Sequence, residues 1–183
     1  MPKSPSPYDF DLDKNPANFQ PLTPLGHLER AAWTYPDRVS VIHGTKRFTW
    51  KETHTRAHKL ADALAKRGIG KGDTVAVLTA NTPEMMEMHF GIPMTGAIIN
   101  TINTRLDAAI IGFILDHGEA DAVFVDREFA GVMAEALKVA KVKPIVIDVD
   151  DSEYDGAGDL IGEMDYEAFI ASGDASFPFT PPD

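Results

Sequence analysis

The sequence predicts an α/β fold, in which a mostly parallel sheet carries helices on both faces and an early β-hairpin precedes the sheet. Short β-branched runs alternate four times with helix-like segments, which is the pattern of a parallel sheet. These runs are almost continuously apolar, as expected for strands that are buried on both faces. The length of 183 residues and the hydrophobic content of 44% are sufficient for one sizeable core.

The first predicted elements are a helix and the hairpin. Thr23-Pro24 is typical of a helix start, and Tyr35-Pro36 ends the helix. Residues 39–43 and 47–50 are predicted strands, joined by a turn that contains Gly44. We expect the buried face of the helix to hold Leu25, Leu28, Ala32 and Trp33.

The second helix has clear signals at both ends. Thr49 and Glu52 have the spacing of a capping box, and Gly68 ends the helix. The glycines from Gly68 to Gly72 form a helix stop and a turn. They are not a dinucleotide-binding loop, because they precede a strand instead of following one.

The middle of the chain is a β-α-β unit. Residues 74–79 and 97–102 are predicted parallel strands, connected by a right-handed crossover helix that Thr82 caps. We expect this helix to kink or end near Gly91, because Pro93 cannot continue it intact.

The later elements follow the same alternation. They are a helix over 107–117, a strand over 121–125, a helix over 129–139, a strand over 144–149 and a short helix over 166–171.

The net charge of −11 is concentrated near the C-terminal end of the sequence. From Asp148 onward there are eleven Asp and Glu residues and no Lys or Arg. This distribution argues against nucleic-acid binding, and we interpret the acidic segment as a solvated, irregular surface. We therefore divide the chain into an N-terminal arm (1–23), an α/β portion (24–150) and an acidic irregular segment (151–183).

Composition also limits the cellular setting. The sequence has no apolar run of membrane-spanning length, and its first residues are polar and Pro-rich, unlike a signal peptide. It contains no cysteine, which excludes disulfides and thiolate chemistry. We expect a cytoplasmic protein without a membrane span.

Two groups of side chains allow both a functional and a structural interpretation. His54 and His58 are four residues apart on one helix, so both could face a metal ion, but no third ligand is near in sequence. The Met-rich segment 85–94 could line an acyl pocket, because flexible thioethers adapt to varied ligands. In both cases we favour the interpretation that these side chains pack within the fold and bind no ligand.

Arg105 is the strongest candidate for ligand binding. It follows a predicted strand and enters the next helix, at the sheet edge where open α/β sheets bind their ligands. A guanidinium group there can bind a phosphate with two hydrogen bonds. The alternative is a surface salt bridge with Asp107 or Asp116.

Several short motifs occur in a characteristic order from Asn18 onward. They are Pro21-Leu22-Thr23-Pro24, Leu28-Glu29-Arg30-Ala31-Ala32, Tyr35-Pro36-Asp37-Arg38, Phe48-Thr49-Trp50-Lys51-Glu52, Asn81-Thr82-Pro83-Glu84, Asn103-Thr104-Arg105-Leu106 and His117-Gly118-Glu119-Ala120. Together they resemble AMP-forming acyl-CoA synthetases, the adenylate-forming ligase family. Thr104 and residues 89–94 are similar to the branch that holds 3-methylmercaptopropionate-CoA ligases and related short- and medium-chain enzymes.

The resemblance implies part of the large N-terminal domain of an adenylate-forming enzyme and a reaction in two steps. ATP and Mg²⁺ first convert a carboxylic acid into an acyl-adenylate and pyrophosphate, and CoA then displaces AMP. In this family the arginine that matches Arg105 helps to hold the 3′-phosphate of CoA. The phosphate loop, the Mg²⁺-binding glutamate, the ribose-binding aspartate and the mobile C-terminal lysine of the family would all lie beyond Asp183.

We accordingly expect no catalytic or metal-binding residue in residues 1–183, no tight binding of ATP, CoA or Mg²⁺ to this segment alone, and no ligase activity from it. Its partners would be the remainder of the same ligase, a small carboxylic acid and a second copy in a homodimer. Two alternatives remain open. One is a stand-alone, non-catalytic α/β binding or interaction module, and the other is an interaction half that reassembles with a separate C-terminal chain.

Overall fold

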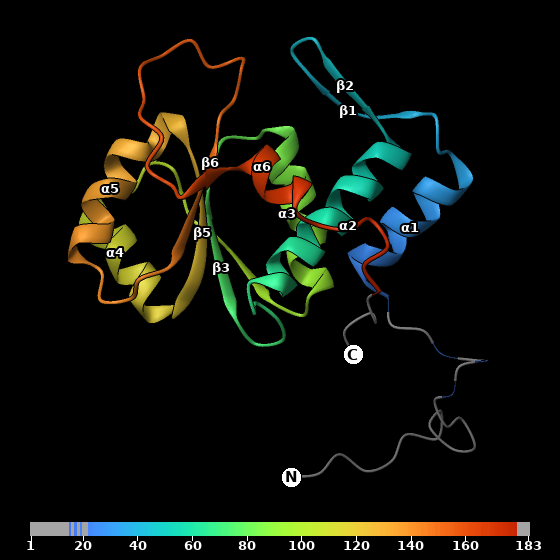
Figure 1. The fold of residues 1–183 in the computed structure, drawn as a ribbon, viewed down its shortest axis with the longest axis horizontal. Coiled ribbons are helices and arrows are strands. Elements are labelled where there is room, and N and C mark those ends of the chain that lie inside the picture. Colours follow the sequence, from blue (N-terminus) through green and yellow to red (C-terminus); the bar gives the residue numbers. More distant parts are fainter. Residues whose placement is uncertain (1–14, 16, 18, 20–21, 179–183) are drawn as a thin grey trace, which may run out of the picture.

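The structure is a computed structural model that describes residues 15, 17, 19 and 22–178 (Figure 1). The predicted arm over residues 1–23 lies almost entirely outside these residues. The elements are α1 (Pro24–Thr34), β1 (Val39–His43), β2 (Lys46–Thr49), α2 (Trp50–Lys66), β3 (Thr74–Leu78), α3 (Pro83–Met94), β4 (Ile98–Thr101), α4 (Ala108–His117), β5 (Ala120–Asp126), the 3₁₀ turn η1 (Arg127–Phe129), α5 (Ala130–Val139), β6 (Ile145–Val149), β7 (Met164–Asp165) and α6 (Tyr166–Ala171).

The predicted α/β fold is confirmed. Five strands form one sheet in the order β4-β3-β5-β6-β7, and every neighbouring pair is parallel. β1 and β2 form a separate antiparallel hairpin. No helix in the described part of the chain is long and apolar enough to cross a membrane.

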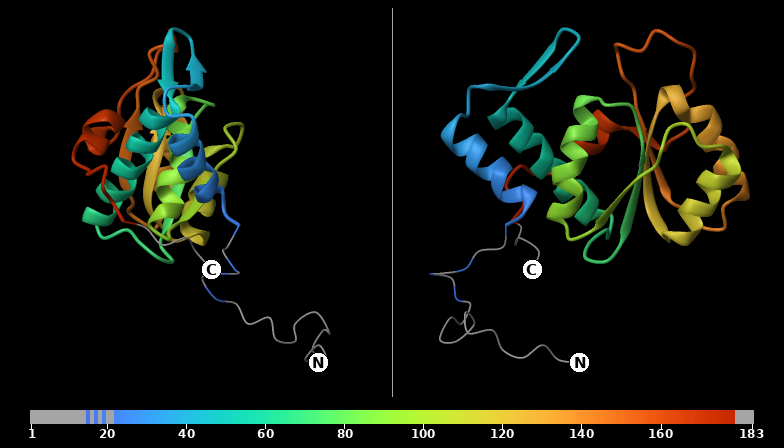
Figure 2. Two further views of the ribbon diagram at one scale, coloured as in Figure 1. Left: turned by 90° about the vertical axis from the view of Figure 1, so that its right-hand side faces the viewer. Right: turned by 180° about the vertical axis from the view of Figure 1, so that it is seen from behind.

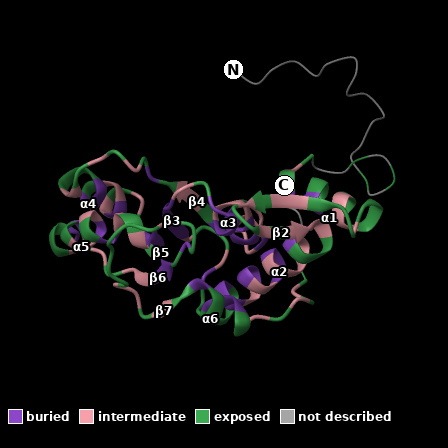
Figure 3. Ribbon diagram, turned by 90° about the horizontal axis from the view of Figure 1, so that it is seen from above, coloured by how far each residue is buried: buried purple, intermediate pink, exposed green. Residues whose placement is uncertain are grey.

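Helices cover both faces of the sheet. Alternate residues of a strand point to opposite faces, so Val75 and Val77 of β3 pack with α2, α3 and α6, whereas Ala76 and Leu78 pack with α4 and α5. α1 lies outside the helices of the first face and contacts α2 and α3 (Figure 2). Buried positions accordingly lie on the strands and on the helix faces turned toward them (Figure 3).

The capping signals are confirmed at both predicted sites. The Thr49 hydroxyl accepts a hydrogen bond from the Glu52 N–H, and the Glu52 carboxylate accepts one from the Thr49 N–H at 2.7 Å, which completes the capping box. The Thr82 hydroxyl likewise accepts from the Met85 N–H at the start of α3. Gly68 has a φ of 82°, a conformation that suits the end of α2.

The sequence predicts a kink or an end of α3 near Gly91, and the end is wrong. The helix continues to Met94 and includes Pro93, because the proline falls in the last turn, which Thr95 N–H closes on the Ile92 carbonyl. Gly91 is a packing residue instead. A Cβ atom there would lie 2.8 Å from the Ala57 carbonyl oxygen, so its absence lets α3 approach α2 closely.

The predicted burial of Trp33 is also wrong. Leu25 and Leu28 are buried, but Trp33 is 87% exposed. Successive helical residues are about 100° apart, so Trp33 is turned about 140° away from Leu28. The core-facing stripe of α1 is therefore narrower than the sequence indicates.

The acidic segment 151–183 is not irregular throughout. It supplies β7, which extends the sheet beside β6, and α6, whose predicted bounds are confirmed. Tyr166, Phe169 and Ile170 of α6 belong to the buried cluster on one face of the sheet. The acidic side chains thus accompany elements that complete the core.

Candidate functional site

The carboxyl ends of the strands define one edge of the molecule. Because the five strands are parallel, these ends lie along a single edge of the sheet, where open α/β sheets bind ligands. The hairpin β1–β2 and the segment that joins β6 to β7 both extend at the same end of the molecule (Figure 1).

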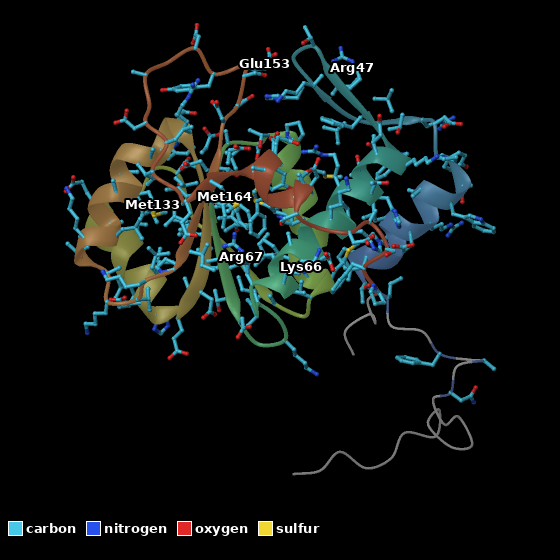
Figure 4. The ribbon with its side chains drawn as sticks, viewed as in Figure 1. Arg47, Lys66, Arg67, Met133, Glu153 and Met164 are labelled. Atoms are coloured by element: carbon cyan, nitrogen blue, oxygen red, sulfur yellow. The ribbon has the colours of Figure 1, made fainter. Side chains whose placement is uncertain are left out.

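A hydrogen bond joins these two extensions. The Nε2 atom of His43 lies 2.9 Å from both carboxylate oxygens of Asp151, and Nε2 must donate because a carboxylate only accepts. In Figure 4 the side chain of Glu153, from the same segment, lies opposite Arg47 of the hairpin. The contact between His43 and Asp151 therefore holds the hairpin against the segment that follows β6, at the carboxyl edge of the sheet.

Three buried carboxylates lie close together at this edge: Glu84, Asp126 and Asp151. Burial raises the pKa of Asp126, and the charges of Asp151 and Glu84 act in the same direction against hydrogen bonds from two backbone N–H groups. Burial also acts to raise the pKa of Asp151, but the Glu153 N–H and His43 outweigh it and hold the pKa below its usual value. The edge therefore combines strong negative charge with low solvent access.

Three buried polar atoms at this edge lack a hydrogen-bond partner among the described residues. They are Oε2 of Glu84, Oγ1 of Thr79 and Nε of Arg127. The other oxygen of Glu84 lies 3.9 Å from Nζ of Lys46, too far for a hydrogen bond. Buried polar groups are nearly always paired, and an ordered water, a ligand or further polypeptide can each supply the missing partner.

The Met-rich segment divides between core and surface. Met88 and Met94 are buried, one against the sheet and the other against α1. Met85 and Met86 line an open groove of about 410 Å³ between the hairpin and the start of α3. The core interpretation is therefore right for Met88 and Met94 and partly right for Met85, which also packs against the sheet cluster, and the groove provides the apolar surface that the alternative requires.

Arg105 lies on the loop that leaves the same edge, because β4 is parallel to β3. Its side chain is exposed and has no ion-pair partner within the described residues. The alternative salt bridge is not seen: Asp107 caps α4 through the Ile110 N–H, and Asp116 accepts from the N–H groups of Lys141 and Val142. The guanidinium is thus available to a ligand.

His54 and His58 do face the same point, as their spacing predicts. Both Nε2 atoms approach the carboxylate of Glu29, which comes from α1. Glu29 is a third potential ligand, and its distance of 25 residues from His54 conceals it in the sequence.

Sequence reasoning missed the buried carboxylates and His43. Glu84 and Asp126 each carried a usable signal, because each stands within a few residues of the carboxyl end of a predicted strand. Asp151 stands equally close to the end of the predicted strand 144–149, but its contact with His43 had no signal, since it joins positions 108 residues apart.

Comparison with known proteins identifies the family. The family model for AMP-binding enzymes matches residues 28–170, which is most of the chain. The chain belongs to this family. Residues 28–170 contain the whole sheet, the hairpin and nearly all of α6, so the match covers the candidate site.

Curated relatives agree with this assignment. A peroxisomal acetate/butyrate–CoA ligase of Arabidopsis thaliana is 42% identical over 183 residues, covering 94% of this chain and 32% of the relative. An acetate–CoA ligase of Humulus lupulus is 42% identical over 184 residues with the same coverage. The chain thus spans about a third of the length of these relatives.

Solved structures of CoA ligases share the fold. An anthranilate CoA ligase in complex with anthranoyl-AMP matches with a TM-score of 0.75 at 20% identity, over 86% of this chain and 29% of that one. A long-chain-fatty-acid CoA ligase from Rhodopseudomonas palustris, described as putative, matches with a TM-score of 0.69 at 27% identity, over 85% and 37%. The predicted architecture, that of the N-terminal domain of adenylate-forming enzymes, is confirmed.

Proposed function

We propose that this chain provides the N-terminal part of an ATP-dependent acid–CoA ligase. The reaction converts a carboxylic acid, ATP and CoA into acyl-CoA, AMP and pyrophosphate. The observation that carries the proposal is the 42% identity to CoA ligases over 94% of the chain, together with the family match.

The acid is a short-chain carboxylic acid. Relatives with this level of identity include ligases for acetate, butyrate and 2-methylpropanoate. The groove beside Met85 and Met86 offers apolar surface suited to a small acyl group. A methylthio-substituted acid such as 3-methylmercaptopropionate fits the same chemistry, so the assay should compare these four acids by kcat/KM.

Arg105 contributes to CoA binding at the carboxyl edge of the sheet. Its exposed guanidinium on the loop after β4 is suited to a phosphate group, which it can bind with two hydrogen bonds. The assignment of this phosphate to CoA rests on the family's reaction.

Replacing the arginine tests this role. In the active ligase, Arg105→Ala should raise the KM for CoA about tenfold or more, because a charge-assisted hydrogen bond contributes roughly 1.5–3 kcal/mol. Adenylate formation, followed by pyrophosphate exchange, should be unchanged. Arg30→Ala removes an exposed guanidinium from α1 and serves as the matched control. Equal loss of both half-reactions would contradict the CoA assignment.

Residues 1–183 alone should not produce acyl-CoA. We expect Mg²⁺, ATP and CoA to bind to the complete ligase and not tightly to this segment. Large apolar side chains on β4 and α4 are exposed, including Ile98, Ile110 and Phe113. Such surface is often covered in an assembled protein, which supports contact with further polypeptide of the same ligase. Acyl-CoA formation by the purified segment would refute this part of the proposal.

Homodimer formation and a cytoplasmic location stay predictions. Light scattering of the purified ligase tests the first, and fluorescence microscopy of the tagged protein tests the second. A cooperative, monomeric segment that binds a metabolite without the rest of the ligase would favour a stand-alone module instead.

A further inference from the structure

Three side chains converge where α1 packs on α2. His54 and His58 lie one turn apart on α2, and Glu29 faces them from α1. Nε2 of His54 is 2.8 Å from Oε1 of Glu29, and Nε2 of His58 is 2.9 Å from the same oxygen. The potential ligand atoms of the three residues all lie within 4.8 Å of one another.

The hydrogen bonds of His58 determine which of its nitrogens carries a proton. Nδ1 lies 3.0 Å from the backbone carbonyl oxygen of Phe177, which can only accept, so Nδ1 must donate. In a neutral imidazole, Nε2 then has a lone pair, and this lone pair faces the Glu29 carboxylate. Two acceptors at this distance need a cation between them, either a proton or a metal ion.

Although the sequence alone predicts no metal-binding residue here, we propose from this geometry that Glu29, His54 and His58 bind a divalent transition metal, for which Zn²⁺ is the best match. Two imidazole nitrogens and one carboxylate oxygen are a donor set that zinc takes in proteins, with water in the fourth position. The carboxylate offsets one of the two charges of the ion. The Phe177 carbonyl holds the His58 ring in the tautomer that binds metal.

The geometry requires only a small adjustment. Zinc bonds of about 2.0–2.1 Å in a tetrahedron place the ligand atoms about 3.3 Å apart. Two of the three pairs already lie at 2.8 and 2.9 Å, and the Glu29 side chain is 42% exposed and free to move outward. Glu29 and His54 also line an open groove of about 450 Å³, which gives water and the ion access to the site.

The site lies in the α1–α2 layer, on different elements from the carboxyl edge of the sheet. The ion would connect α1 to α2, and through the Phe177 carbonyl to the end of the described chain. The role of the ion is therefore to stabilise the α1–α2 layer, and this proposal does not depend on the proposed ligase reaction.

Metal analysis of the purified protein tests the proposal. After dialysis against ZnCl₂ and removal of excess ion, mass spectrometry of elements should find one zinc per chain. His54→Ala and Glu29→Gln should each lower this content at least tenfold, while His27→Ala, an exposed histidine on α1 outside the cluster, should leave it unchanged. Circular dichroism shows whether each variant is folded.

Two further measurements use the unaltered protein, so they test zinc binding even if a variant fails to fold. Co²⁺ in place of Zn²⁺ should give the visible absorption of a four-coordinate site in the unaltered protein. Zinc at about 100 times its dissociation constant should raise Tm by roughly 5–10 °C. Absence of bound zinc in the unaltered protein, or zinc that persists in both His54→Ala and Glu29→Gln, overturns the proposal and assigns the cluster to a protonated ion pair.

Discussion

Glu84 and Glu87 stand three residues apart on α3, and both are buried, but their surroundings are opposite. The Glu87 carboxylate accepts a hydrogen bond from Arg56 Nε at 2.6 Å and another from the Tyr166 hydroxyl at 2.8 Å. Glu84 lies at the carboxyl edge of the sheet, where its Oε2 atom has no partner within the described residues. One helix therefore carries one satisfied and one unsatisfied buried acid.

The different surroundings of Glu84 and Glu87 suggest different roles, since only Glu87 is fully hydrogen-bonded within the described part of the fold. Glu87 connects α2, α3 and α6, so its hydrogen bonds hold the acidic C-terminal elements on the sheet. An unpaired buried oxygen such as Oε2 of Glu84 costs folding free energy, about 1–3 kcal/mol, and the other oxygen of Glu84 has only a distant ion pair with Lys46 at 3.9 Å. We therefore expect Glu84 to matter less for the stability of the fold than Glu87.

The largest effect is expected from Arg56→Met at pH 8. This change leaves the buried Glu87 carboxylate without its cation, which typically costs about 3–5 kcal/mol of unfolding free energy. Urea denaturation measures the loss. Arg30→Met, at an exposed position of α1, should change stability by less than about 0.5 kcal/mol. A loss below about 1 kcal/mol for Arg56→Met would show that the buried pair is not central to the core.

Tyr166→Phe should have a smaller effect, about 1–3 kcal/mol, because it removes one donor from the buried carboxylate. The matched control is Tyr154→Phe, since the Tyr154 hydroxyl makes an exposed hydrogen bond to the Ala157 carbonyl. The same denaturation experiment measures both variants. Equal losses would mean that the Glu87 network has no special role.

The pH dependence of stability should reveal Glu87 directly. Burial raises the pKa of Glu87 to about 7, from 4.5 for an unperturbed carboxyl, despite the opposing effect of Arg56. Between these values the folded protein binds a proton that the unfolded chain has lost, so stability falls as pH rises from about 4.5 to 7. The slope should be on the order of 1 kcal/mol per pH unit.

Glu87→Gln cannot titrate and should therefore reduce this slope. Unfolding free energies from urea titrations at several pH values provide the measurement. An identical slope in the protein and in Glu87→Gln would assign the pH dependence to other groups.

Local signals in the sequence were sufficient for most of the fold. Thr49 with Glu52, Thr82 and Gly68 mark helix ends through contacts with their own neighbours, so one sequence predicts them well. β7 was missed because two residues carry no periodicity. The role of Gly91 was missed because it depends on the approach of α2, which is a tertiary contact.

The candidate site was predictable only in part. The position of Arg105 follows from the order of strand and loop, and the structure excludes the alternative ion pairs with Asp107 and Asp116. The grouping of Glu29 with the two histidines depends on how α1 packs against α2, which the sequence does not encode locally. The same holds for the difference between Glu84 and Glu87, since their partners come from distant segments.

The comparison between the two acids is tested most directly by Glu84→Ala and Glu87→Ala. Each variant is measured for unfolding free energy and, in the complete protein, for the proposed CoA-ligase activity. Glu87→Ala should lose about 1–3 kcal/mol, because the buried Tyr166 hydroxyl loses its acceptor and Arg56 keeps only Glu167 as a carboxylate partner. Glu84→Ala should change stability by less than about 1 kcal/mol and still lower the activity. Equal losses of stability, or full activity in Glu84→Ala, would contradict the assignment of the sheet edge to function.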